Sequence, residues 1–138
     1  MMKLSIIVPV YNLEKYIAKT LDSLLSIRFS YDYEIIVVND GSTDASETVI
    51  RDYQQKTDKI RLFTIENGGV SNARNVGIGY ARGQYITFMD GDDTVEPCFF
   101  EKAVAKLEGG HYDLVQGNYA EVHENRVVPR RLVKWDVE

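Results

Sequence analysis

Short apolar runs alternate with amphipathic segments along most of this chain. Four runs rich in β-branched residues are typical of buried strands and occupy residues 4–10, 34–38, 60–65 and 84–89. Each is followed by a segment whose apolar residues recur at helical spacing, at 13–25, 45–53, 70–81 and 99–107. Because strand–helix alternation builds parallel sheets covered by helices, the pattern predicts a mostly parallel α/β sheet with helices on both faces.

Turn and cap residues predict where these elements begin and end. We expect Asn12 to cap the first helix and Asp44 the second, because Asn and Asp side chains accept hydrogen bonds from the free N–H groups of a first helical turn. After the fourth helix, residues 113–124 predict a fifth strand. A turn near Asn125 and a weaker strand at 127–128 follow.

The composition is that of one globular domain. The chain has 138 residues, of which 44% are hydrophobic and 27% charged. Its 16 Lys and Arg against 21 Asp and Glu give a net charge of -5 without a basic tract, which argues against a general nucleic-acid surface. The single cysteine, Cys98, excludes an internal disulfide, and no apolar run is long enough to span a bilayer. Because the first strand begins without an apolar leader, we expect a cytoplasmic protein.

Polar and acidic residues gather where the predicted strands end. The segments concerned are residues 9–12, Asp40, residues 67–69 and residues 90–93. In an open parallel sheet, ligands bind beyond the carboxyl ends of the strands. The sequence therefore predicts a ligand site built from segments that are up to about eighty residues apart in the chain.

The sequence Asp-Gly-Asp-Asp at residues 90–93 is a candidate metal site. Asp90, Asp92 and Asp93 repel one another unless a cation lies among them, and oxygen ligands suit Mg²⁺ or Mn²⁺. The alternative is a solvated acidic turn. The position after a buried strand favours the metal. An EF-hand calcium loop fits poorly because Val95 stands where that loop needs glycine.

Three further side chains are candidates for binding a nucleotide. Asp40 could accept a hydrogen bond from the N3–H of uracil or thymine, or it could serve as a turn residue. Tyr11 could stack on a base or pack against the sheet, and Arg74 could contact a phosphate or a base or lie in solvent. No glycine-rich loop follows the first strand, so the dinucleotide-binding fingerprint is absent.

Four ordered blocks of the sequence resemble the family 2 glycosyltransferases. They are IIVPVYN at 6–12, VVNDGSTD at 37–44, GVSNARN at 69–75 and GQYITFMDGDD at 83–93. The resemblance implies a GT-A fold with a Rossmann-like sheet. It also implies inverting transfer of a sugar from a nucleotide-diphosphate donor, usually a UDP-sugar, to an acceptor hydroxyl, assisted by Mn²⁺ or Mg²⁺.

The resemblance also assigns roles to individual residues at the donor end. Pro9 and Tyr11 are similar to residues that line the nucleoside pocket. Asp40 is similar to the carboxylate that contacts the base. Arg74 lies in the Ala-Arg-Asn block and is implied to help hold the donor.

The acidic loop carries the remaining roles implied by the resemblance. Asp90 is similar to the residue that faces the ribose, and Asp92 to the metal ligand that meets the diphosphate. Asp93 is implied to contact the donor sugar or only to cap a turn.

One expected component is missing from the sequence. Family members take a catalytic base from a following, acceptor-facing half, and no candidate for it occurs here, so we expect the base beyond residue 138. We therefore predict a donor-binding domain at 1–125, and at 126–138 the irregular start of an acceptor-side region. This chain alone is expected to bind the donor but to transfer sugar poorly.

Two other functions remain as alternatives. One is a sugar-phosphate nucleotidyltransferase, although residues 12–15 lack the glycine-rich basic loop of such enzymes. The other is a non-catalytic module that binds nucleoside diphosphates. For the glycosyltransferase, the resemblance implies saccharide or glycolipid acceptors and a location in the cytoplasm or on the inner face of the membrane.

Overall fold

The computed structural model describes residues 1–110, 112–123 and 126–130. Its elements, in chain order, are β1 (Leu4–Val10), α1 (Ile17–Leu25), β2 (Tyr33–Asp40), α2 (Ser46–Gln54), β3 (Ile60–Ile65), α3 (Val70–Tyr80), β4 (Tyr85–Phe88), α4 (Phe99–Gly109), β5 (Tyr119–His123) and β6 (Arg126–Arg130). The chain forms two compact units, of which the first is Met1–Cys98 and the second begins at Phe99.

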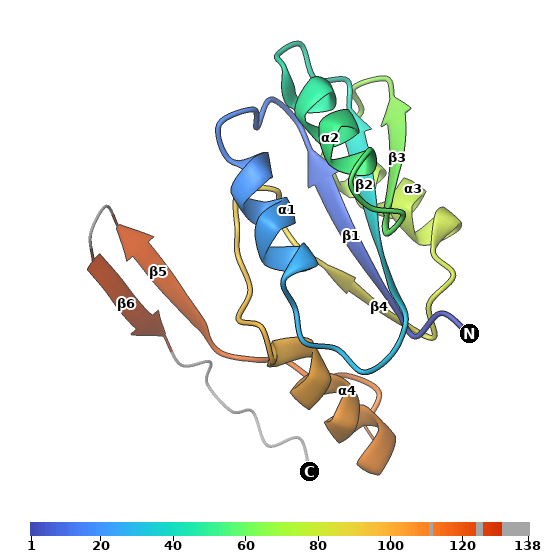
Figure 1. Ribbon diagram of the computed structural model, residues 1–138, viewed down its shortest axis with the longest axis vertical. Coiled ribbons are helices and arrows are strands. Elements are labelled where there is room, and N and C mark those ends of the chain that lie inside the picture. Colours follow the sequence, from blue (N-terminus) through green and yellow to red (C-terminus); the bar gives the residue numbers. More distant parts are fainter. Residues whose placement is uncertain (111, 124–125, 131–138) are drawn as a thin grey trace. The chain divides into compact units, whose positions relative to one another are not determined.

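The first unit is built on a four-stranded parallel sheet in the order β3-β2-β1-β4. The chain moves outward from β1 to β3 and then returns past β1 to β4. Because crossovers between parallel strands are right-handed, this reversal puts α3 on the opposite face from α1 and α2. Figure 1 shows α1 and α2 in front of the sheet and α3 behind it. The predicted α/β sheet with helices on both faces is confirmed.

The two central strands explain why the sequence shows continuous apolar runs. Every residue of β1 and β2 is buried, since helices cover both faces of these strands. On the α3 face, Ile7, Ile36, Val38 and Ala73 form one hydrophobic cluster. A Cβ at Gly77 would overlap the side chain of Ile7, so the glycine lets α3 lie close against β1.

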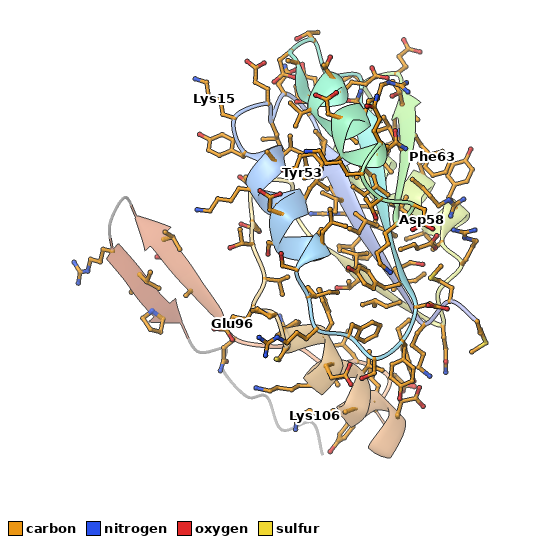
Figure 2. The ribbon with its side chains drawn as sticks, viewed as in Figure 1. Lys15, Tyr53, Asp58, Phe63, Glu96 and Lys106 are labelled. Carbon is orange, nitrogen blue, oxygen red and sulfur yellow. The ribbon has the colours of Figure 1, made fainter. Side chains whose placement is uncertain are left out.

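A polar contact joins two helices outside this cluster. The hydroxyl of Tyr53 in α2, a residue labelled in Figure 2, donates to an Asp22 oxygen in α1 at 2.6 Å. This hydrogen bond, together with burial and the negative charge of Asp22, raises the pKa of Tyr53 to about 12. The bond ties α1 to α2 on their shared face of the sheet.

Glu34 is a buried carboxylate near the amino end of β2, at the opposite end of that strand from Asp40. Ser5 Oγ donates to it at 2.7 Å, Arg61 Nη1 at 2.9 Å, and Arg82 from its backbone N–H at 2.8 Å and from Nη2 at 2.7 Å. Burial raises the pKa of Glu34, but these hydrogen bonds outweigh it and lower the pKa to about 2. The carboxylate therefore stays ionised and links three strand ends.

The second unit corrects the length and pairing of the predicted fifth strand and confirms the strand predicted after it. The fifth strand is shorter than predicted, Tyr119–His123, and it pairs antiparallel with β6 rather than joining the parallel sheet. The weaker strand predicted at 127–128 is confirmed as β6, Arg126–Arg130, so the segment 126–138 is not irregular at its start, where pairing with β5 satisfies the backbone. The turn at Asn125 and residues 131–138 lie outside the described residues. The domain boundary at residue 125 stays a prediction.

No helix in the described ranges could cross a membrane. The longest of them, α3 and α4, have 11 residues each, whereas a bilayer requires about 20 apolar residues.

Candidate functional site

The carboxyl ends of the four parallel strands surround one cleft of about 490 Å³. Its lining residues come from the end of every strand in the sheet: Pro9, Val10, Tyr11, Leu13, Asp40, Asn67, Gly69, Val70, Asp90, Gly91 and Asp92. Because parallel strands all end at the same edge of their sheet, segments far apart in the sequence meet there. Five of the seven residues predicted for the site line this cleft. Of the other two, Arg74 contacts Asp90, and Asp93 lies beside Asp90 and Asp92.

Pro9 and Tyr11 come from the end of β1. Pairing between β1 and β4 ends at Ile7 and Phe88, so Pro9, which has no N–H to donate, lies beyond the last pair of that ladder. Tyr11 follows the strand and is 50% exposed while it lines the cleft. Its ring is thus available to a ligand and is not part of the core.

Asn12 does not cap the first helix, and that prediction is wrong. Helix α1 begins at Ile17, and its N-cap residue makes no side-chain hydrogen bond. Asn12 has a left-handed backbone, φ 51°, and its Oδ1 accepts the N–H groups of Thr43 at 2.8 Å and Asp44 at 3.3 Å. Asn12 therefore joins the loop after β1 to the loop after β2.

Asp44 also joins the loop after β1 to the loop after β2. Its Oδ1 accepts the N–H of Ser46, the first residue of α2, at 2.9 Å, and its Oδ2 accepts the N–H of Glu14 at 3.1 Å. Partial burial raises the pKa of Asp44, but the hydrogen bonds from Ser46 and Glu14 outweigh this and hold the pKa below its usual value. The N-cap residue of α2 is Ala45 and not Asp44 as predicted, but Asp44, one residue earlier, bonds the first N–H of the helix and also holds the loop after β1.

Asp40 ends β2 and anchors the loop before α3. The side chain is 3% exposed, and its two oxygens accept the N–H groups of Gly68 at 2.8 Å and Gly69 at 3.0 Å. Its backbone carbonyl accepts a hydrogen bond from Asn67 Nδ2 at 3.0 Å. An ionised carboxylate accepts about four hydrogen bonds, so Asp40 keeps acceptor capacity toward the cleft that it lines.

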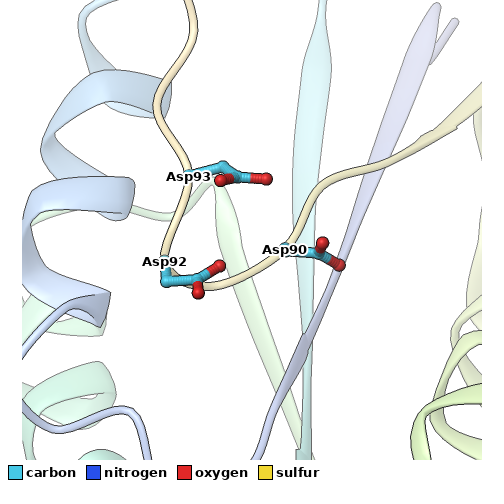
Figure 3. Close-up of side chains that lie close together, drawn as sticks. All are labelled: Asp90, Asp92 and Asp93. Carbon is cyan, nitrogen blue, oxygen red and sulfur yellow. The ribbon is translucent and has the colours of Figure 1, made fainter. Parts of the chain in front are cut away.

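The three carboxylates of the acidic loop lie close together (Figure 3). One oxygen from each of Asp90, Asp92 and Asp93 lies within 4.8 Å of the others, and all three residues are exposed. The N–H of Asp93 donates to the Asp90 carbonyl at 3.1 Å, which closes a tight turn. Partial burial, and then the negative charges of Asp92 and Asp90, raise the pKa of Asp93. These oxygens fit a hard divalent cation, which would relieve the repulsion.

Arg74 connects α3 to this loop. Its Nη2 donates to Asp90 Oδ1 at 3.2 Å. Its Nε is buried and has no hydrogen-bond partner in the described part of the chain. Arg74 thus places a positive charge beside the cleft, and its Nε–H remains able to donate a hydrogen bond.

Several lining residues have no individual role predicted by the sequence. Asn67 and Gly69 stand out in it only as part of a segment that follows a strand, and Val70 begins α3 directly after them. Gly91 is buried, and a Cβ there would approach Leu13 Cδ1 to 2.8 Å, so the acidic loop lies tightly against the loop after β1. Proximity to a strand end is the sequence feature that identifies all of them.

Known proteins are similar to this chain in fold and in sequence. The family described as "Glycosyl transferase family 2" matches residues 5–135. The uncharacterized glycosyltransferase EpsJ of Bacillus subtilis is 45% identical over 130 residues, which are 93% of this chain and 38% of EpsJ. The crystal structure of S. aureus TarS 1–349 in complex with UDP-GlcNAc has a TM-score of 0.77 at 31% identity, over 94% of this chain and 37% of that one.

A third similar protein is the mannosyltransferase PcManGT from Pyrobaculum calidifontis in complex with GDP-Man and Mn²⁺. Its TM-score is 0.64 at 25% identity, over 74% of this chain and 31% of that one. The chain thus spans well under half the length of these proteins. Its parallel sheet with flanking helices is the fold of GT-A glycosyltransferases, as the sequence predicts. The match over residues 5–135 and the identity to EpsJ show that this chain belongs to glycosyl transferase family 2.

Proposed function

We propose that the cleft binds the nucleotide part of a UDP-sugar and that the protein transfers the sugar to an acceptor hydroxyl with inversion. The observation that carries this proposal is the convergence of Asp40, Asp90 and Asp92 on one cleft at the carboxyl edge of the sheet. The similarity to TarS, which was crystallised with UDP-GlcNAc and with UDP, supports uridine as the nucleoside.

In this proposal, Pro9 and Tyr11 contact the nucleoside, and Asp40 accepts the N3–H of the uracil ring. Both oxygens of Asp40 already accept a loop N–H, and each has a second lone pair with which it could accept the N3–H of the base. Cytosine has no N–H at N3 and would be disfavoured. Asp90 accepts a ribose hydroxyl, and Arg74 beside it helps to hold the donor.

Asp92 is the proposed ligand of Mn²⁺ or Mg²⁺, with Asp90 and Asp93 adding negative charge beside it. The donor set is all oxygen, and its mutual repulsion in the free protein favours a bound cation. When bound, the ion neutralises the diphosphate and stabilises it as a leaving group. The similarity to PcManGT, which holds Mn²⁺ together with GDP-Man, supports this assignment.

The complete reaction is proposed for the whole protein rather than for these 138 residues. An acceptor hydroxyl is a poor nucleophile until a base takes its proton, and we place that base in a region beyond residue 138. Saccharides or glycolipids are the proposed acceptors, met in the cytoplasm or at the inner face of the membrane. The donor-binding part alone should hold UDP with little transfer.

Calorimetry with UDP, CDP and GDP, each with and without Mn²⁺, tests the proposal. We expect UDP to bind most tightly and Mn²⁺ to strengthen its binding. Asp92→Ala should remove the Mn²⁺-dependent part of the affinity, whereas Asp52→Asn, which removes an exposed carboxylate from α2, should not. Equal UDP affinity in the wild type and in Asp92→Ala at saturating Mn²⁺ would refute the metal role. Absence of nucleotide binding would refute the proposal as a whole.

A further inference from the structure

Helix α1 holds the acidic loop through two hydroxyl groups. Thr20 Oγ1 lies 2.9 Å from the Gly91 carbonyl oxygen and 2.7 Å from that of Asp93. Thr20 is 1% exposed, and the residues that it joins are 71 and 73 positions away in the sequence. One hydroxyl proton is thus shared between the two carbonyls that flank Asp92.

Ser23, one helical turn further along α1, holds the end of the same loop. Its Oγ donates to the Val95 carbonyl at 3.0 Å and accepts the Val95 N–H at 2.8 Å. Ser and Thr within a helix commonly bond back to a carbonyl of their own helix. Both hydroxyls are instead used on the loop, so α1 fixes the backbone of residues 91–95 at three points.

This fixation matters because the loop carries like charges that push it apart. Asp92 is exposed, and no side chain in the described residues donates a hydrogen bond to its carboxylate. Its direction therefore depends on the backbone on either side of it. The Thr20 hydroxyl holds that backbone, and the Asp93 N–H to Asp90 carbonyl bond closes the turn.

We propose that Thr20 is a positioning residue for metal-dependent donor binding. Its hydroxyl holds the Gly91 and Asp93 carbonyls and thereby keeps the Asp92 carboxylate directed into the cleft, while Ser23 secures the end of the loop. This inference rests on the proposed function, in which Asp92 holds the cation.

Three variants test the role of Thr20. Thr20→Val keeps the shape of the side chain and removes the hydroxyl, and Thr20→Ser keeps the hydroxyl. Thr48→Val makes the first change at an exposed position of α2 and serves as the matched control. Calorimetry measures UDP affinity with and without Mn²⁺. Hydrogen exchange by NMR, in protein free of metal, measures protection of the Asp93 amide.

Thr20→Val should weaken UDP binding in the presence of Mn²⁺ by about threefold to tenfold, the equivalent of one net hydrogen bond. The Mn²⁺-free affinity should be unchanged, and exchange of the Asp93 amide should accelerate. Thr20→Ser should bring the UDP affinity in the presence of Mn²⁺ and the protection of the Asp93 amide back toward the wild type. Thr48→Val should match the wild type in both measurements. If Thr20→Val fails to fold, Ser23→Ala should show the same selective loss to a smaller extent.

Each alternative outcome overturns the inference in a different way. Wild-type Mn²⁺ dependence in Thr20→Val would show that the hydroxyl does not position Asp92. Equal losses with and without Mn²⁺ would reveal a general structural role. A wild-type protein whose UDP binding ignores Mn²⁺ would instead refute the metal role in the proposed function, and the wild type is therefore titrated first.

Discussion

Replacing Asp40 by asparagine should weaken both the fold and the binding of UDP, for separable reasons. In the free protein the two carboxylate oxygens accept the N–H groups of Gly68 and Gly69. Asparagine offers one oxygen and one NH₂ group, so one of these N–H groups would face another donor. The remaining oxygen would then be shared between the loop and the N3–H of a bound uracil.

The size of each effect follows from the burial of Asp40, which is 3% exposed. A hydrogen bond to a buried charged acceptor contributes about 1.5–3 kcal/mol. We therefore expect Asp40→Asn to lower the free energy of unfolding by about 2 kcal/mol, and the melting temperature by roughly 8 °C for a domain of this size. The loss of UDP affinity should be about tenfold to a hundredfold, from the same range for one hydrogen bond.

A double-mutant cycle separates the two effects. UDP and N3-methyl-UDP are titrated into the wild type and into Asp40→Asn, with denaturant unfolding of both proteins measured in parallel. Methylation removes the N–H that Asp40 would accept, so it should weaken nucleotide binding to the wild type more than to the variant. The coupling free energy between the two changes should be at least about 1 kcal/mol. If methylation weakens binding equally in the two proteins, Asp40 does not contact the base and serves only to anchor the loop.

Three further variants test the contacts that support the sheet and the loops. Glu34→Gln should lower the free energy of unfolding at pH 7 by about 3 kcal/mol, since the pKa of Glu34 falls from 4.5 to about 2 on folding. The wild type should hold this stabilisation above pH 4.5 and lose it as the pH falls toward 2, whereas the variant should lack that dependence; parallel acid titrations followed by circular dichroism check this. Asn12→Gly keeps the left-handed backbone but removes the acceptor for Thr43 and Asp44, and should lower stability by about 1 kcal/mol. Asn12→Asp retains an acceptor and should lie closer to the wild type in thermal melts; a reversed order would contradict the assigned hydrogen bonds.

The parallel sheet and the location of the cleft are predictable from the sequence because both depend on local patterns. A strand that is buried on both faces needs a continuous apolar run, and a helix that packs on a sheet needs apolar residues at its own period. The order of these patterns then determines the parallel pairing and places the strand-end residues at one edge. The sequence alone therefore suffices to assign Asp40, Asp90 and Asp92 to one site, and all three line the cleft.

The tertiary structure alone decides which partner each polar side chain has. Asn12 has the sequence context of a helix cap but bonds to a loop 31 residues away, and Thr20 reaches the acidic loop across 71 residues. A hydroxyl or an amide can satisfy its hydrogen bonds locally or at a distance with nearly equal energy, so sequence spacing does not distinguish the two. Only the packing of α1 and the loops against the sheet selects one partner.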